Sequence, residues 1–188
     1  MKRKLKSLIK IAHRDTLLLW KTPREYLYSF TYPTDKYVNI MPYDPAVTRT
    51  GEKLISKIHA LYPDLKVHFI GSSVLGISGQ KDIDLIIESP PKDFHLYISG
   101  LISILGEPTK RRRNLIEWGT KVGGCTIDVL MLDHSNPIGR KTIKTYERIK
   151  KNKLFLQQYE KLKLDSDGIS LREYKRRRLQ FFNVVDGI

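Results

Sequence analysis

The chain has 188 residues, 40% hydrophobic and 10% aromatic, which argues against disorder and suits one domain with extensions. Its single cysteine, Cys125, excludes a disulfide framework and a cysteine-based zinc site, so we expect a reducing compartment, the cytoplasm. The net charge of +14 lies at the ends, because residues 39–139 hold eleven basic and eleven acidic residues while the flanks carry +6 and +8.

The basic flanks have more than one interpretation. Clustered Lys and Arg gain by displacing counterions from phosphates, so the ends favour contact with a polyanion such as nucleic acid. The runs "KRKLK", "RIKKNK" and "YKRRR" are equally typical of solvated helix faces, and membrane-surface binding by the N-terminal helix is a third reading. No segment approaches the roughly 18 apolar residues of a membrane span, so we expect a soluble protein.

The first two thirds of the chain alternate helical and strand patterns. We expect a helix over residues 2–30, broken near Thr22–Pro23, a proline-rich connection, a helix over 50–61, strands over 67–71 and 81–88, and a helix from Pro90–Pro91 to about residue 105.

The last third begins with two strands within residues 114–132, joined at the turn-forming pair Gly123–Gly124. Two basic helices follow, over 138–164 and 169–185, separated by "DSDG". The order predicts an α+β fold, a mixed β-sheet flanked by helices with basic N-terminal and C-terminal helical extensions. We expect an extension over 1–37, a core over 38–137, and C-terminal helices over 138–188 packed on that core.

Acidic residues interrupt two otherwise apolar strands. Asp82 and Asp84 alternate with isoleucines and so point to one face, where two carboxylates repel unless they are solvated or share a cation. Asp128 lies in "CTIDVLML", again an acid in an apolar strand. Three carboxylates from two adjacent strands would hold two divalent cations. Asp128 also fits a solvent-facing position or a pair with an arginine.

A glycine turn precedes these acids. Gly71 and Ser72 directly follow an expected strand, where backbone N–H groups and a hydroxyl approach phosphate oxygens. Ser73 extends this candidate cradle, and Lys81 is a candidate triphosphate contact. The alternative is that Ser72 and Ser73 simply cap a turn or helix.

The combination resembles the polymerase-β-type nucleotidyltransferase superfamily, whose pattern is hydrophobic-Gly-Gly/Ser, a spacer, then Asp-hydrophobic-Asp with a later third acid. Ile70-Gly71-Ser72, Asp82-Ile83-Asp84 and Asp128 satisfy each position. The resemblance implies that Asp82 and Asp84 hold two Mg²⁺ ions, with Mn²⁺ as the alternative metal. It also implies that Asp128 binds the ion nearer the nucleophile and acts as general base, while Gly71 and Ser72 cradle the β and γ phosphates.

A second resemblance, to the GrpB family, runs from about Val38 to the C-terminus. It is carried by "VNIMPYDP", "HFIGSS" and "TYERIKKNKLFLQQYEKLK". The loop "VLGISGQ" departs from that family's pattern, with Gly76 as the retained glycine and Asp84 matching the family's acid. Asp82 falls where the family typically has an apolar residue, so this chain matches the active superfamily pattern more fully.

The sequence therefore predicts a metal-dependent nucleotidyltransferase that moves a nucleoside monophosphate from an NTP, such as ATP, to an acceptor hydroxyl. RNA, protein and small molecules are the candidate acceptors, with RNA meeting the basic helices. The alternative is a catalytically inactive nucleotide- or RNA-binding module of the GrpB type. The oligomeric state is left open.

Overall fold

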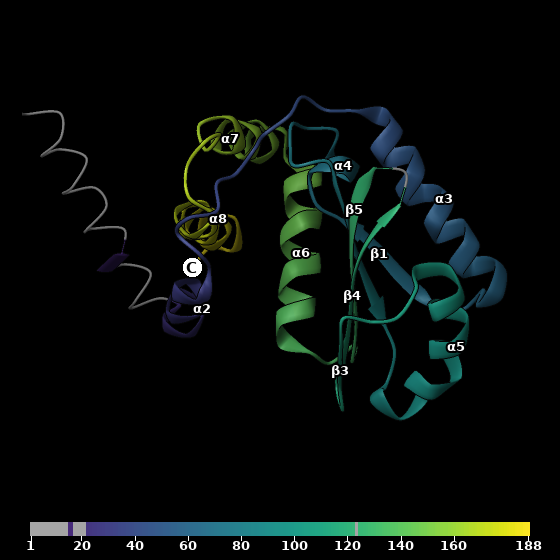
Figure 1. Cartoon of the computed structure of the whole chain (residues 1–188). Coiled ribbons are helices and arrows are strands. Elements are labelled where there is room, and N and C mark those ends of the chain that lie inside the picture. Colours follow the sequence, from purple (N-terminus) through teal and green to yellow (C-terminus); the bar gives the residue numbers. More distant parts are fainter. Residues whose placement is uncertain (1–14, 17–21, 123) are drawn as a thin grey trace, which may run out of the picture. The chain divides into compact units, whose positions relative to one another are not determined.

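The computed structural model describes residues 15–16, 22–122 and 124–188 (Figure 1). The chain divides into two compact units, one formed by Met41–Asn152 and the other by Met1–Ile40 together with Lys153–Ile188. The first contains the β-sheet and is called the sheet unit. The second is called the helical unit.

The sheet unit contains a five-stranded sheet of order β1-β2-β5-β4-β3. Strands β2 and β5 pair in parallel and every other neighbouring pair is antiparallel, which confirms the predicted mixed sheet of an α+β fold. The strands are β1 (Lys66–Ile70), β2 (Asp82–Glu88), β3 (Lys110–Arg112), β4 (Leu115–Val122) and β5 (Cys125–Leu132).

Helices cover the two faces of this sheet unequally. One face packs against α3 (Pro45–Leu61) and α5 (Phe94–Leu105) along the whole of β2 and β5, and this is the main hydrophobic core. The other face meets α6 (Pro137–Lys151) (Figure 1). Ile143 of this helix packs against Ile86 and Leu132 in a smaller cluster. The sheet therefore has one fully covered face and one partly covered face.

Helix α3 begins earlier than the sequence pattern predicted, at Pro45 rather than at residue 50. Asp44 is its N-cap, and one carboxylate oxygen accepts a hydrogen bond from the Ala46 N–H at 3.0 Å. That hydrogen bond, and then one from Lys81, hold the pKa of Asp44 below its usual value. An aspartate followed by proline was the available signal for this start.

Three features differ from the sequence-based expectation. Strand β3 and helix α4 (Ser72–Leu75) were not predicted, because three charged residues and a single helical turn show no hydrophobic period. The expected helix over 138–164 is two helices, α6 and α7 (Lys153–Leu164), which meet at Asn152. The compact units divide the chain at 40/41 and 152/153, so α6 belongs to the sheet unit, while the expected functional bounds at 37/38 and 137/138 stay a prediction.

The helical unit joins segments that are distant in sequence. It contains α2 (Pro23–Tyr28), the 3₁₀ turn η1 (Ser29–Thr31), α7 and α8 (Leu171–Asp186). The Val38 N–H donates to the Ile169 carbonyl at 2.9 Å, and the Gly168 N–H donates back to the Val38 carbonyl at 2.9 Å. Helix α2 starts at the predicted break, whereas most of the expected N-terminal helix lies outside the described residues.

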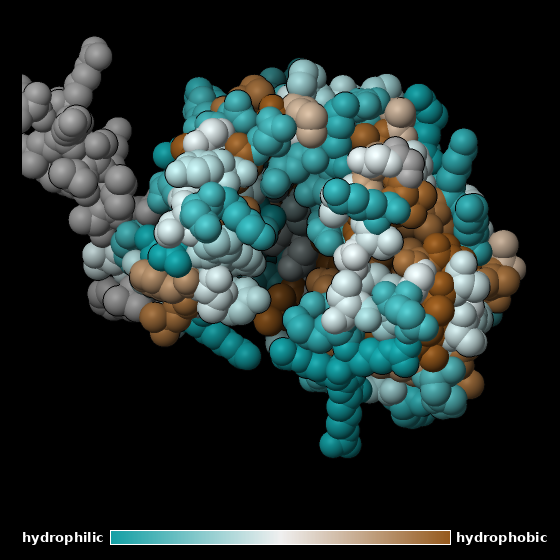
Figure 2. All heavy atoms as spheres, in the orientation of Figure 1, coloured by the Kyte–Doolittle hydropathy of each residue, from teal (hydrophilic) through white to brown (hydrophobic). Residues whose placement is uncertain are grey.

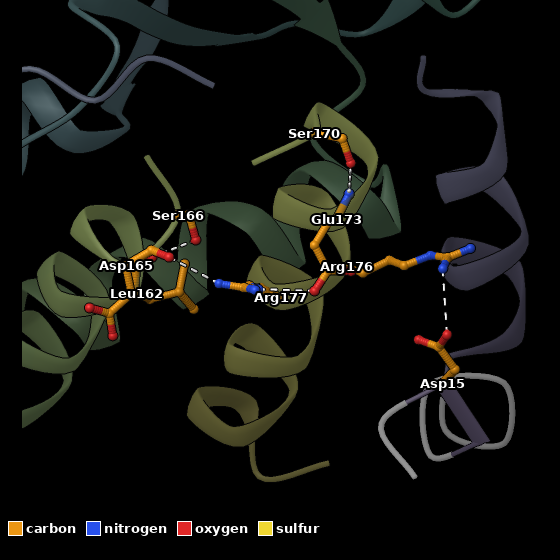
Figure 3. Close-up of polar contacts among 8 residues, drawn as sticks. All are labelled: Asp15, Leu162, Asp165, Ser166, Ser170, Glu173, Arg176 and Arg177. Atoms are coloured by element: carbon orange, nitrogen blue, oxygen red, sulfur yellow. Dashed lines mark hydrogen bonds and ion pairs between the residues drawn. The ribbon is translucent and has the colours of Figure 1, made fainter. Parts of the chain in front are cut away.

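The arginines of α8 bind their own chain (Figure 3). Arg176, whose side chain is 13% exposed, reaches Asp15 at 3.4 Å and Ser29 at 3.1 Å, and its guanidinium lies 4.3 Å from the Phe30 ring centroid. Arg177 binds the Glu173 carboxylate and the Asp165 carbonyl, each at 3.0 Å (Figure 3). These guanidinium groups therefore tie α8 to other parts of the helical unit.

Hydrophilic residues make up most of the face seen in Figure 2. Large hydrophobic side chains at the surface are spread over several elements, including Leu61 of α3 and Leu96 of α5. Among the described residues, no helix is both long enough and apolar enough to cross a membrane.

Candidate active site

The strand register places the predicted motif residues in one row across the sheet. Ile70 of β1 pairs with Asp84 of β2, Asp84 pairs with Asp128 of β5, and Asp128 pairs with Gly119 of β4. Paired strands lie about 4.8 Å apart, so Asp84 and Asp128 are direct neighbours on one face. The sequence prediction that these two acids come together is therefore met by the register. Asp82 lies on the same face but opposite Thr126, two residues from this row.

The acids lie on the partly covered face. Along β5, buried and exposed residues alternate, with Ile127 and Val129 fully buried and Asp128 exposed between them. Asp84 is half-buried between the buried Ile83 and Leu85. Hydrophobic neighbours thus fix both strands in the core while the acids point away from it.

A pocket of about 200 Å³ opens at this row. Asp84 and Asp128 both line it, together with other residues of β2 and β5 and with residues of β1, β4 and the loop before β3. These other lining residues include Ile70, Ile86, Thr109, Glu117, Gly119 and Leu130. The sequence analysis did not single out Glu117. This residue lies on the same face of β4 as Gly119, and its carboxylate forms an ion pair with Lys110 at 2.9 Å. Its position in an alternating strand was the only available signal.

The glycine turn lies directly against Asp84. Gly71 has φ +91° and ψ −176°, a conformation open almost only to glycine. A Cβ atom at this position would overlap Oδ2 of Asp84. Both the backbone conformation and the close approach of the acid therefore require glycine, whether or not a phosphate binds.

Ser72, Ser73 and Lys81 line a second, smaller recess. The two serines are 3% and 6% exposed, and the recess of about 10 Å³ has room for about one water. The Lys81 ammonium lies 3.2 Å from Asp44 at the start of α3. This recess shares no lining residue with the acid pocket, although Ser72 directly follows Gly71, which lies against Asp84. The role of these three residues in phosphate binding stays a prediction.

The donor chemistry of the row suits a hard divalent cation. Asp84 and Asp128 supply carboxylate oxygens, the ligands that Mg²⁺ prefers, from adjacent strands. Across the described part of the chain, no three His, Cys, Asp or Glu side chains are grouped as a ready metal cage. Asp84 and Asp128 are thus the residues that fit one ion, while the three-carboxylate site with Asp82 stays a prediction.

Comparison with known proteins shows which solved structures the fold resembles. The chain matches no protein-family model and no curated protein. Among solved structures, GrpB from Enterococcus faecalis matches with a TM-score of 0.61 and 16% identity, over 79% of this chain and 94% of GrpB.

Two solved enzymes overlap with smaller parts of the chain. The Cid1 poly(U) polymerase with MgGTP bound gives a TM-score of 0.46 at 16% identity, over 64% of this chain and 41% of Cid1. A cytoplasmic RNA terminal U-transferase gives 0.40 at 19% identity, over 58% of this chain and 36% of that enzyme.

The match to GrpB confirms, at the level of structure, the GrpB resemblance seen in the sequence. Over most of its length, the chain has the fold of GrpB.

Proposed function

We propose that the protein is a metal-dependent nucleotidyltransferase, with its reaction centre at Asp84 and Asp128. The observation that carries this proposal is the row across the sheet, in which the glycine turn and the two acids lie side by side on a face that is open to a pocket. A buried strand has no structural need for adjacent carboxylates, because like charges repel. Their placement beside a phosphate-compatible turn supports a catalytic role.

The proposed reaction joins an acceptor hydroxyl to the α-phosphorus of an NTP. The oxygen–phosphorus bond forms, the bond from the α-phosphorus to the bridging oxygen breaks, and pyrophosphate leaves with that electron pair. Asp128, the exposed acid of the pair, takes the proton of the hydroxyl. The Gly71 turn, which has no side chain, lets the triphosphate approach the backbone next to Asp84.

A divalent ion such as Mg²⁺, when bound, would polarise the phosphoryl oxygen and neutralise charge on the triphosphate. Asp84 and Asp128 would hold it, and Asp82 would contribute to a second ion as the superfamily resemblance implies. The burial of Ser72 and Ser73 leaves the Gly71 backbone as the main candidate phosphate contact.

One observation favours the alternative of a non-catalytic binding module. The predicted cradle residues Ser72, Ser73 and Lys81 lie around their own small recess instead of the acid pocket. A protein that keeps the fold without turnover would still bind a nucleotide at the turn. Nucleotidyl transfer releases pyrophosphate, whereas nucleotide binding without turnover does not.

The test is Mg²⁺-dependent pyrophosphate release, measured with each of the four NTPs and a mixed extract of RNA, protein and metabolites as acceptors. We expect release that depends on both an acceptor and Asp84. Nucleotide binding in equilibrium dialysis without any release, for both the wild type and Asp84→Asn, would contradict transfer and support the binding module.

RNA is one candidate acceptor, through exposed cations of the C-terminal third. Lys150 and Lys151 of α6 and Lys153 of α7 are exposed. Arg176 and Arg177, in contrast, are held by contacts within the helical unit. Any contact with successive phosphates would therefore rest on the lysines more than on the α8 arginines.

A further inference from the structure

The acid pocket continues beyond Asp128 onto strand β4. Gly119 is the partner of Asp128 in the register, and Glu117 is the partner of Leu130 one step along the same face. All four residues line the pocket. We propose that the β4 side of the pocket, at Gly119 and Glu117, binds the acceptor, and that the acceptor is a neutral or amino-bearing polyol. This inference rests on the proposed nucleotidyl transfer.

The order of the row assigns the two substrates to opposite ends. The glycine turn lies at the β1 end, against Asp84, and Gly119 lies at the β4 end, against Asp128. The attacking and leaving oxygens of a phosphoryl transfer lie roughly in line on opposite sides of the phosphorus. With pyrophosphate leaving toward the turn, the hydroxyl approaches from the side of β4, where Asp128 can take its proton.

Gly119 leaves space where the acceptor has to lie. Its φ is in the range of ordinary residues, so the backbone does not require glycine here. A Cβ atom would sit 3.7 Å from both Asp128 Oδ1 and Thr109 Cγ2, which is ordinary contact. Neither packing nor conformation accounts for the glycine, and its effect is an open volume beside the proposed base.

The polar groups on this side accept hydrogen bonds. Within the described part of the chain, Lys110 is the one residue that contacts the Glu117 carboxylate, through Oε2 at 2.9 Å, which leaves Oε1 able to accept. The Thr109 hydroxyl already donates to the Glu117 carbonyl at 3.1 Å. A cation at Asp84 and Asp128 would offset the charge of those acids, while Lys110 partly offsets that of Glu117.

Such a lining accepts hydrogen bonds from hydroxyl and ammonium groups, and the Glu117 carboxylate disfavours a phosphate placed against its Oε1. Leu130, which is 36% exposed, adds an apolar surface against which the C–H face of a sugar ring can pack. A pocket of about 200 Å³ is smaller than the ~300 Å³ lower bound of typical drug-sized sites, so it suits a group of monosaccharide size. A polyol or amino-polyol meets all three conditions: hydroxyl or ammonium groups, a C–H face and a size that fits the pocket.

The test uses α-³²P-labelled NTPs, Mg²⁺ and four defined acceptors: glucosamine, sorbitol, glucose 6-phosphate and a short RNA with a free 3′-hydroxyl. We expect label on glucosamine or sorbitol, and at least tenfold less on the two phosphate-bearing probes. Glu117→Gln should raise the KM for glucosamine about tenfold with little change in kcat, as expected for one charge-assisted hydrogen bond.

Gly119→Val fills the proposed acceptor space. Lys121→Val is the control, because it places the same side chain on the same exposed face of β4 but outside the pocket. We expect Gly119→Val alone to abolish transfer and the rise in melting temperature caused by glucosamine. The rise caused by NTP should remain in both variants.

The outcomes separate the inference from the proposed function. Asp84-dependent label on RNA or glucose 6-phosphate, or full transfer by Gly119→Val, would overturn the acceptor assignment and leave nucleotidyl transfer standing. No Asp84-dependent transfer to any of the four probes would overturn the acceptor assignment, and it would overturn nucleotidyl transfer as well only if the mixed extract also gives no Asp84-dependent pyrophosphate release.

Discussion

The partly covered face of the sheet and helix α8 both carry charged residues, but the surroundings of these residues differ. Asp84 and Asp128 line a pocket, and their hydrophobic strand neighbours supply the packing. Arg176 is only 13% exposed and contacts Asp15, Ser29 and Phe30 of its own chain. The comparison teaches that the contacts of Arg176 account for its place in the fold, whereas the packing of the strands does not by itself account for two acids at a pocket.

The largest effect should come from the sheet. We expect Asp84→Asn to lower nucleotidyl transfer at least about 1,000-fold, because a bound divalent ion supplies several kcal/mol of transition-state stabilisation. The free energy of unfolding should be equal or higher, since one of two neighbouring like charges is removed. Single-turnover kinetics and urea unfolding measure the two quantities. An unfolded variant would make Asp84 a structural residue like Arg176 and break the comparison.

Gly71→Ala should affect both function and stability. The residue would have to adopt φ +91° and displace the Asp84 carboxylate, so we expect a loss of about 1–3 kcal/mol in unfolding free energy together with weaker NTP binding. Gly119→Ala is the matched control, because its backbone is ordinary and its Cβ has room. Thermal melts with and without NTP compare the pair. Equal stability of the two variants would contradict the strain at the turn.

Arg176→Gln should destabilise the helical unit by about 2 kcal/mol, because it removes an ion pair, a hydrogen bond and a cation–π contact. Arg113 is exposed and lies outside every ion pair of the described residues, so Arg113→Gln should stay within about 0.5 kcal/mol. Urea unfolding followed by circular dichroism measures both. If Arg176→Gln is as stable as the wild type but flattens the salt dependence of RNA binding, the arginine is a phosphate contact instead.

The smallest effect should be at Asp44, a charge of the sheet unit that is structural. Its pKa is lowered from 3.8, first by the Ala46 N–H and then by Lys81, so the folded chain holds the charged form more strongly than the unfolded chain. Its contribution is complete above pH 3.8 and is lost as the pH falls through the lowered pKa.

Asp44→Asn keeps an N-cap side chain and loses the charge. We expect little change in stability at pH 7 and a shallower fall in stability as the pH drops below 3.8, measured by urea titration at a series of pH values. An unchanged acid transition would show that the charge of Asp44 does not contribute to stability.

The sequence by itself determined most of the main elements and the face on which two acids lie. Alternation fixed that Asp84 points away from the core, and a strand followed by Gly71 and Ser72 indicated the turn, because side-chain period and glycine conformation are local properties. The start of α3 and the strand β3 escaped the same reasoning. A cap at Asp44 and three charged residues at a sheet edge carry no hydrophobic period.

Only the tertiary structure decided which residues meet. The register of β5 with β2 and β4 brought Asp128 beside Asp84 and opened the pocket at Gly119 and Glu117. Folding also placed Lys81 against Asp44, and Arg176 against segments more than a hundred residues away. Pairing and packing between distant segments are set by the free energy of the whole fold. No local pattern in this chain could therefore have assigned Gly119 and Glu117 to the pocket or the partners of Lys81 and Arg176, whereas the meeting of Asp84 and Asp128 was expected.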